Sequence, residues 1–97
     1  MQQYIILRRN GFTSLEDLEE RGKVSASVGD TPGSGVRWIR SYVLNEESGD
    51  VGTVCVYEGE NVEAIREHAA KAGLPCDEVI ATHGTVVVRP DPIEAAA

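Results

Sequence analysis

The hydrophobic positions of the chain alternate between the two-residue period of strands and the 3.6-residue period of helices. Runs rich in β-branched and aromatic residues predict strands, and apolar residues three or four apart predict helices. The expected elements are strands at 4–8, 36–44 and 53–58, helices at 14–28 and 61–72, and a last strand within 79–89. Val86–Val88 is the strongest part of that last strand. The predicted order is β-α-β-β-α-β.

Capping and turn residues mark the ends of these elements. Asn10–Gly11 is expected to end the first strand. Ser14 and Asn61 are typical N-cap residues, since their side chains can accept from the free amides of a first helical turn. Gly73 suits the left-handed position that follows a helix. These residues place the start of both helices and the end of the second one.

This order is that of the ferredoxin-like split unit, an α+β fold in which two helices cover one face of a four-stranded antiparallel sheet. The length of 97 residues suits one domain. We expect that domain over residues 1–90 and a flexible C-terminal tail over 91–97. The sheet face opposite the helices would be exposed in a monomer, and we expect a dimeric, α/β-barrel-like assembly to bury it.

Strand alternation assigns side chains to the two faces of the sheet. Trp38, Arg40 and Tyr42 share one face of the second strand. On the third strand the branched aliphatic residues suit the helix-covered core, which leaves Cys55 and Tyr57 on the open face. Open aromatic faces usually mark an interface or a ligand site. We therefore expect a homodimer through this face, with these aromatic residues and Arg40 at the interface or pocket. The alternative is a monomer whose sheet has one solvent-exposed face with scattered aromatic residues.

The charge balance limits the classes of partner. Sixteen acidic against nine basic residues give a net charge of −7. Such a field repels phosphate backbones and anionic lipid surfaces, which argues against nucleic acid and membranes as partners. The first residues carry no pattern of a secretory signal. Cys55 and Cys76 form no Cys-x-x-Cys pair or disulfide framework, so a reduced, cytoplasmic setting is expected.

The candidate chemistry lies in Cys55, Glu58 and His68, which fall within fourteen positions of one another. Thiolate, carboxylate and imidazole bind transition metals, and they also serve proton transfer or nucleophilic catalysis. Glu58 and His68 are expected on the same, helix-facing side. Cys55 points to the other face, so one ion can reach all three only through a bulge or a second subunit. A structural role for His68, as a tie between helix and strand, stays open.

Four segments resemble one family of small bacterial ferredoxin-like domains of unknown function, partly described as nickel-binding proteins (SCO4226-like). The segments are Gly35–Val43, Cys55–Glu58, Glu63–Ala69 and Ala72–Pro75. The positions that match its recurrent pattern are Trp38, Ser41, Tyr42, Cys55, Tyr57, Glu58 and His68. Members often carry a histidine where this chain has Arg40, so one potential ligand is replaced.

The resemblance implies a dimeric domain that binds nickel. His68, Glu58 and Cys55 are then the expected ligands of Ni²⁺, and other divalent transition metals suit the same donors. Two other functions remain open. One is a small-molecule binder or cofactor-free enzyme of the dimeric α+β barrel type, which rests on fold analogy. The other is a regulatory or interaction domain without chemistry. No established catalytic or metal-binding motif is present to decide among them.

Overall fold

The computed structural model describes residues 1–92. The elements follow the predicted order: β1 (Gln2–Phe12), α1 (Leu15–Gly29), β2 (Val36–Asn45), β3 (Val51–Gly59), α2 (Val62–Ala72) and β4 (Glu78–Ala81). The sheet order is β2-β3-β1-β4, and every neighbouring pair of strands is antiparallel. This is the expected α+β, ferredoxin-like fold. Neither helix in the described part of the chain is long and apolar enough to cross a bilayer.

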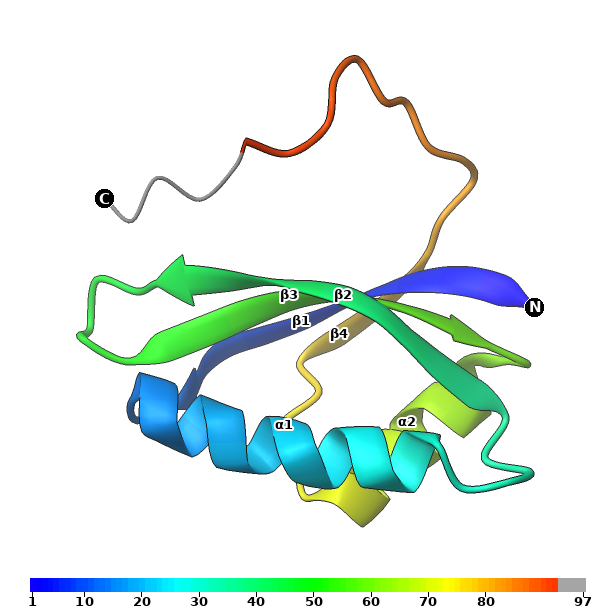
Figure 1. Cartoon of the computed structure of the whole chain (residues 1–97), viewed down its shortest axis with the longest axis horizontal. Helices are drawn as coiled ribbons and strands as arrows, with labels where there is room; N and C mark the ends of the chain where they lie inside the picture. The colour runs from blue at the N-terminus through cyan, green and yellow to red at the C-terminus, as the bar shows by residue number, and fades with distance from the viewer. Residues whose placement is uncertain (93–97) are drawn as a thin grey trace.

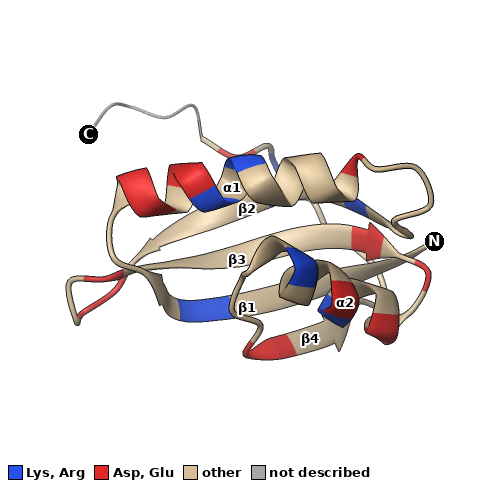
Figure 2. Ribbon diagram, turned by 90° about the horizontal axis from the view of Figure 1, so that it is seen from below, with Lys and Arg blue, Asp and Glu red and all other residues tan. Residues whose placement is uncertain are grey.

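The molecule has a helical layer, a sheet and an extended C-terminal segment on the far side of the sheet (Figure 1). Seen from the helical side, α1 lies along the β2 side of the sheet and α2 along the β4 side (Figure 2). The helices therefore cover one face only. The other face meets the C-terminal segment, residues 82–92, which we call the arm.

Both helices begin, and α2 also ends, as the capping residues predict. The Ser14 side chain accepts a hydrogen bond from the backbone N–H of Asp17, and Asn61 accepts one from Ala64 in the same way. Each cap satisfies an amide that has no partner within its own helix. Gly73 ends α2 at φ 68°, a left-handed conformation that glycine adopts without strain.

The first strand is longer than expected. It continues through Asn10 and Gly11 to Phe12, with an irregularity in its pairing to β3 between Arg8 and Phe12. Asn10 takes φ 50°, which asparagine tolerates better than most residues. The predicted break is therefore a bulge inside the strand, because a local turn in the backbone need not end the sheet.

The last strand lies earlier than expected. The structure forms β4 at Glu78–Ala81, paired with Tyr4–Leu7 of β1, whereas Val86–Val88 belongs to no strand and is almost fully exposed. Strand propensity marks Val86–Val88, but the short connection after α2 brings residues 78–81 to the free edge of β1 first. The tail expected at 91–97 is described only to Pro92, and residues 93–97 lie outside the described residues.

The two sheet faces carry different residues from those predicted. Cys55 and Tyr57 are 5% and 1% exposed beneath the helices, so their assignment to the open face is wrong. Trp38 also faces the helices, since it stacks on Tyr57 with ring centroids 6.1 Å apart. A bulge between Trp38 and Arg40 shifts the alternation, and Arg40 therefore faces the open side.

The core lies between the helices and the centre of the sheet. Its buried residues are Tyr4, Ile6, Val36, Cys55, Tyr57 and Ile65. Ile6 and Ile65 are fully buried, and burial of side chains this size contributes roughly 1.5–3 kcal/mol each to folding. Arg8 continues the inward row of Tyr4 and Ile6 along β1, so a cation follows two hydrophobic residues into the interior.

Candidate functional site

A chain of hydrogen bonds links three elements beneath the sheet. The Tyr57 hydroxyl of β3 and Ser25 Oγ of α1 lie 2.8 Å apart, and Ser25 Oγ lies 3.0 Å from His68 Nε2 of α2. All three residues are buried. Ser25 can donate to one neighbour and accept from the other, so its hydroxyl fixes how the two helices meet the sheet. His68 thus ties helices to strand, which is the structural role left open above.

Burial keeps these groups neutral. It lowers the pKa of His68 below its usual value of 6.5, and the nearby Arg8 cation acts in the same direction. Burial also raises the pKa of Tyr57. At neutral pH the network therefore consists of a phenol, a hydroxyl and an uncharged imidazole. His68 Nδ1 is buried and has no hydrogen-bond partner within residues 1–92.

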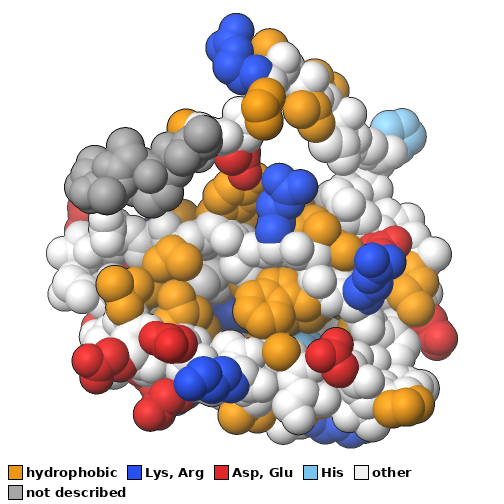
Figure 3. All heavy atoms as spheres, viewed as in Figure 1, with side chains coloured by type: hydrophobic (Ala, Val, Ile, Leu, Met, Phe, Trp, Pro, Cys, Tyr) orange, Lys and Arg blue, Asp and Glu red, His pale blue; other side chains and the backbone are white. Residues whose placement is uncertain are grey.

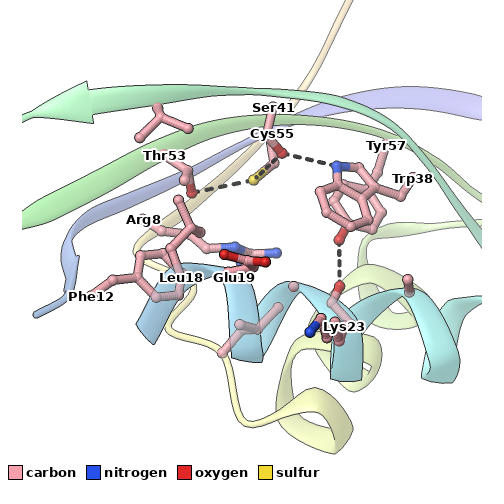
Figure 4. Close-up of a pocket in the computed structure, with 15 residues that line it drawn as sticks. Arg8, Phe12, Leu18, Glu19, Lys23, Trp38, Ser41, Thr53, Cys55 and Tyr57 are labelled. Atoms are coloured by element: carbon pink, nitrogen blue, oxygen red, sulfur yellow. Dashed lines mark hydrogen bonds between the residues drawn. The ribbon is translucent and has the colours of Figure 1, made fainter. Parts of the chain in front are cut away.

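A second set of hydrogen bonds joins β2 to β3. Trp38 Nε1 donates to Ser41 Oγ at 2.9 Å, Ser41 Oγ donates to Cys55 Sγ at 3.0 Å, and the thiol in turn donates to Thr53 Oγ1 at 3.3 Å (Figure 4). The thiol is held between two hydroxyl groups. Cys55 is therefore a buried, hydrogen-bonded residue of the sheet and not an exposed nucleophile.

Between α1 and the sheet lies a cavity of about 480 Å³, which we call the α1 pocket. Phe12, Leu18 and Trp38 form much of its apolar wall, and Arg8 and Cys55 contribute polar groups. Figure 4 shows these side chains converging between α1 and the strands. The volume is in the range of small-molecule sites.

The expected metal ligands do not meet. Glu58 pairs with Arg37 at 3.5 Å, and strand alternation places its carboxylate on the face opposite Tyr57. His68 instead bonds Ser25, so the expected contact between Glu58 and His68 is wrong. Within residues 1–92 no three His, Cys, Asp or Glu side chains lie close enough to hold a metal ion. Residues 1–92 of one chain therefore bring together no set of three such side chains for a nickel ion.

On the open face, Tyr42 and Arg40 contact the arm. The Tyr42 hydroxyl donates to Asp91 Oδ2 at 2.8 Å, and Arg40 Nη1 lies 3.5 Å from the same oxygen. Of the residues expected at the interface or pocket, Arg40 and Tyr42 are thus on the open face, while Trp38 and Tyr57 are on the helical side. The aromatic cluster predicted from the sequence is divided between the two faces.

Two residues of this region were missed by sequence reasoning, namely Arg8 and Ser25. Arg8 could have been found, because it falls on the same alternate positions as Tyr4 and Ile6 and so must point inward. Ser25 carried no comparable signal. It falls within the helix expected at 14–28, but its partners come from β3 and α2, which are distant in the sequence.

Comparison with known proteins gives a family and a fold. The family described as "Nickel responsive protein SCO4226-like" matches residues 4–81. The crystal structure of SCO4226 from Streptomyces coelicolor A3(2) is similar to this one at a TM-score of 0.71 and 18% sequence identity, covering 87% of this chain and 99% of that one. No curated protein matches the chain. Since the family match spans most of the sequence, this chain belongs to the nickel-responsive SCO4226-like family.

Proposed function

We propose that the protein binds Ni²⁺ as a homodimer, at a site whose ligands come from both chains. The family is described as nickel-responsive, which supports the metal. The observation that carries the shared site is the scatter of donors, since no three His, Cys, Asp or Glu side chains of residues 1–92 come together. Ni²⁺ needs several nitrogen, oxygen or sulfur ligands. A second chain is the direct source of the missing ones.

The open face of the sheet is the proposed contact surface. Ile39, Tyr42 and Ile80 are each at least 40% exposed, and in the arm Val86, Val87 and Val88 are 92%, 72% and 80% exposed. Figure 3 shows the arm standing away from the body of the molecule above this face. Burial of such apolar surface drives association, and a symmetric pair would cover the same patch on both chains.

Glu58 is the expected ligand best placed for a shared site. It lies on the open-face side of β3, and its side chain is 32% exposed. In a two-fold dimer each residue of the interface enters twice, so one accessible carboxylate per chain supplies two ligands. His68 is neutral, as a histidine ligand must be, but its Nδ1 atom is buried. Cys55 is also buried, and its thiol is hydrogen-bonded to Ser41. These two therefore contribute only if the helical layer moves.

Sedimentation combined with isothermal titration tests this proposal. Ni²⁺ should bind with no more than one ion per shared site and should shift the monomer–dimer equilibrium toward the dimer, because a ligand that bridges chains stabilises their association. Glu58→Gln should remove most of the binding heat. Glu63→Gln, on the exposed side of α2, is the matched control and should behave as the native protein.

Two outcomes would contradict the proposal in different ways. Undiminished Ni²⁺ binding by protein diluted to monomers would exclude a shared site. A stable dimer that gives no heat with Ni²⁺, Zn²⁺ or Cu²⁺ would leave an interaction domain without metal chemistry.

A cytoplasmic setting is also proposed, because both cysteines are free thiols in residues 1–92.

A further inference from the structure

Arg8 is a buried cation without a counter-ion. The residue is 1% exposed, and it takes part in none of the ion pairs found within residues 1–92. Nη1 donates to the Pro75 carbonyl at 2.7 Å, whereas Nη2 is buried without a hydrogen-bond partner. A charge removed from water without a partner is costly, and proteins retain one where it serves a purpose.

The guanidinium lies at the α1 pocket. Arg8 is among the residues that line this 480 Å³ cavity, and Figure 4 shows its guanidinium extending from β1 into the space between Cys55 and α1. Its Cζ is 6.0 Å from the centroid of the Tyr57 ring. The thiol of Cys55 and the hydroxyl of Thr53 line the same pocket and are hydrogen-bonded to each other. Glu19 is the carboxylate of the lining, and it forms no ion pair with Arg8.

Most of the remaining wall of the pocket is apolar. Phe12, Leu18, Trp38 and Val43 line it, and the charged residues Glu19 and Lys23 of α1 line it where they are exposed to solvent. A buried cation in a mainly apolar cavity matches a molecule with one anionic group and an apolar body. A carboxylate fits the planar fork of arginine, which can give it two parallel hydrogen bonds.

We propose that the α1 pocket binds a small amphipathic carboxylate, whose anionic group pairs with Arg8 and whose hydrocarbon part lies against Trp38 and Phe12. The unpartnered Nη2 gains an acceptor, and the buried charge gains a counter-ion. This site is separate from the shared metal site, since it needs neither a metal ion nor a second chain.

Trp38 is the single tryptophan of the chain, so its fluorescence reports on the pocket directly. Octanoate is the probe, and octanamide, which has the same hydrocarbon chain without the charge, is its matched control. Octanoate should change the emission of Trp38 saturably. Octanamide should bind about tenfold to hundredfold more weakly, as expected for loss of a hydrogen-bonded ion pair.

Variants separate binding from folding. Arg8→Met keeps an unbranched side chain as far as the position of Nε and removes the charged guanidinium, so it should abolish the preference for octanoate over octanamide. Its melting temperature should be equal to or above that of the native protein, because replacing an uncompensated buried charge with an apolar group removes a desolvation cost. Arg8→Lys should bind octanoate with intermediate affinity, since a point charge lacks the fork.

The proposal is overturned if octanoate produces no saturable change in the native protein, or if both probes bind equally. It is also overturned if folded Arg8→Met retains the preference for the acid. A variant at Gly22, whose Cβ would lie 3.7 Å from the Trp38 ring, gives an independent check: Gly22→Leu should fill the pocket and weaken both probes without touching Arg8. Unchanged octanoate affinity in folded Gly22→Leu would place the probe elsewhere and overturn the proposal. Failure of Ni²⁺ binding would leave these results unaffected, so the two proposals can fail separately.

Discussion

The two faces of the sheet differ in how they place polar and apolar groups, beyond the hydrophobic core that lies under the helices. Beneath the helices lie a cation, an imidazole, a phenol and a thiol, contributed by Arg8, His68, Tyr57 and Cys55. On the opposite side, large apolar groups such as Val86 and Ile39 meet solvent. The helical side is closed by hydrogen bonds as well as by packing. The open side has surface still available for burial.

This difference indicates where specificity and association reside. A buried polar group is tolerated only where its partners are positioned, so the helical side defines one arrangement of residues distant in sequence. An exposed apolar group carries no such requirement and can be covered by another surface. Substitutions on the helical side should therefore act on folding, and those on the open side on assembly.

The largest effect is expected from Tyr57→Ala. The side chain is 1% exposed, and its loss would leave a cavity in the core and remove one of the two hydrogen-bond partners of Ser25 Oγ. The free energy of unfolding should fall by about 3–5 kcal/mol, measured by chemical denaturation. Tyr57→Phe, which removes only the hydroxyl, should cost about 1 kcal/mol. Equal losses in the two variants would show that the hydrogen bond, and not the packing, dominates this side.

The pH dependence of stability tests the buried imidazole. Because burial lowers the pKa of His68 below 6.5, the unfolded chain binds a proton before the folded one does as the pH falls. The free energy of unfolding is therefore unaffected by protonation of His68 above about pH 6.5. It decreases as the pH falls from about 6.5 to the pKa of His68 in the folded state. The slope for one proton is at most about 1.4 kcal/mol per pH unit.

Denaturation of the native protein and of His68→Gln across this window measures the effect. The glutamine amide can still bond Ser25 but does not titrate, so this part of the slope should disappear. Stability of the native protein that stays flat between neutral pH and about pH 5 would mean that His68 is protonated equally well in both states.

The smallest effect on folding is expected on the open face. Tyr42→Ala removes the same type of side chain as Tyr57→Ala, but Tyr42 is 42% exposed, and its hydroxyl bonds two exposed groups, Asp91 of the arm and Arg40. The free energy of unfolding of the monomer should change by roughly 0.5 kcal/mol, within the range of surface substitutions. Dimerisation should weaken, measured by sedimentation. A loss comparable to that in Tyr57→Ala would mean that the faces do not differ in this respect.

The sequence predicted the order of elements and the helix ends, because these depend on local signals such as Ser14, Asn61 and Gly73. It did not predict which strand face Tyr57 occupies. On β3 alternation groups the residues correctly but leaves the choice of face open, and the aliphatic neighbours suggested the wrong one. A phenol with a polar tip suits the interior when a partner such as Ser25 is there, and that partner is visible only in the fold.

The candidate site was predictable in part. Spacing along the chain brought Cys55, Glu58 and His68 into one group, and the structure separates them because adjacent side chains of a strand leave on opposite faces. The contact between Glu58 and Arg37 joins two strands across the hairpin and has no local signature. Arg8 was open to prediction from the alternation of β1, and its cavity was not.

The bulge in β2 has a consequence for how this sheet tolerates change. One additional residue between Trp38 and Arg40 lets Trp38 and Ser41 both reach the helical side, where Ser41 holds the Cys55 thiol. Deleting Ile39 would remove the extra residue and leave a regular ladder, in which Trp38 still opposes Tyr57 and Ser41 still opposes Cys55. Every remaining side chain of β2 would keep its face, so the hydrogen bond between Ser41 and Cys55 should survive. The bulge is thus a place where this strand can lose one residue without exchanging its inside and outside.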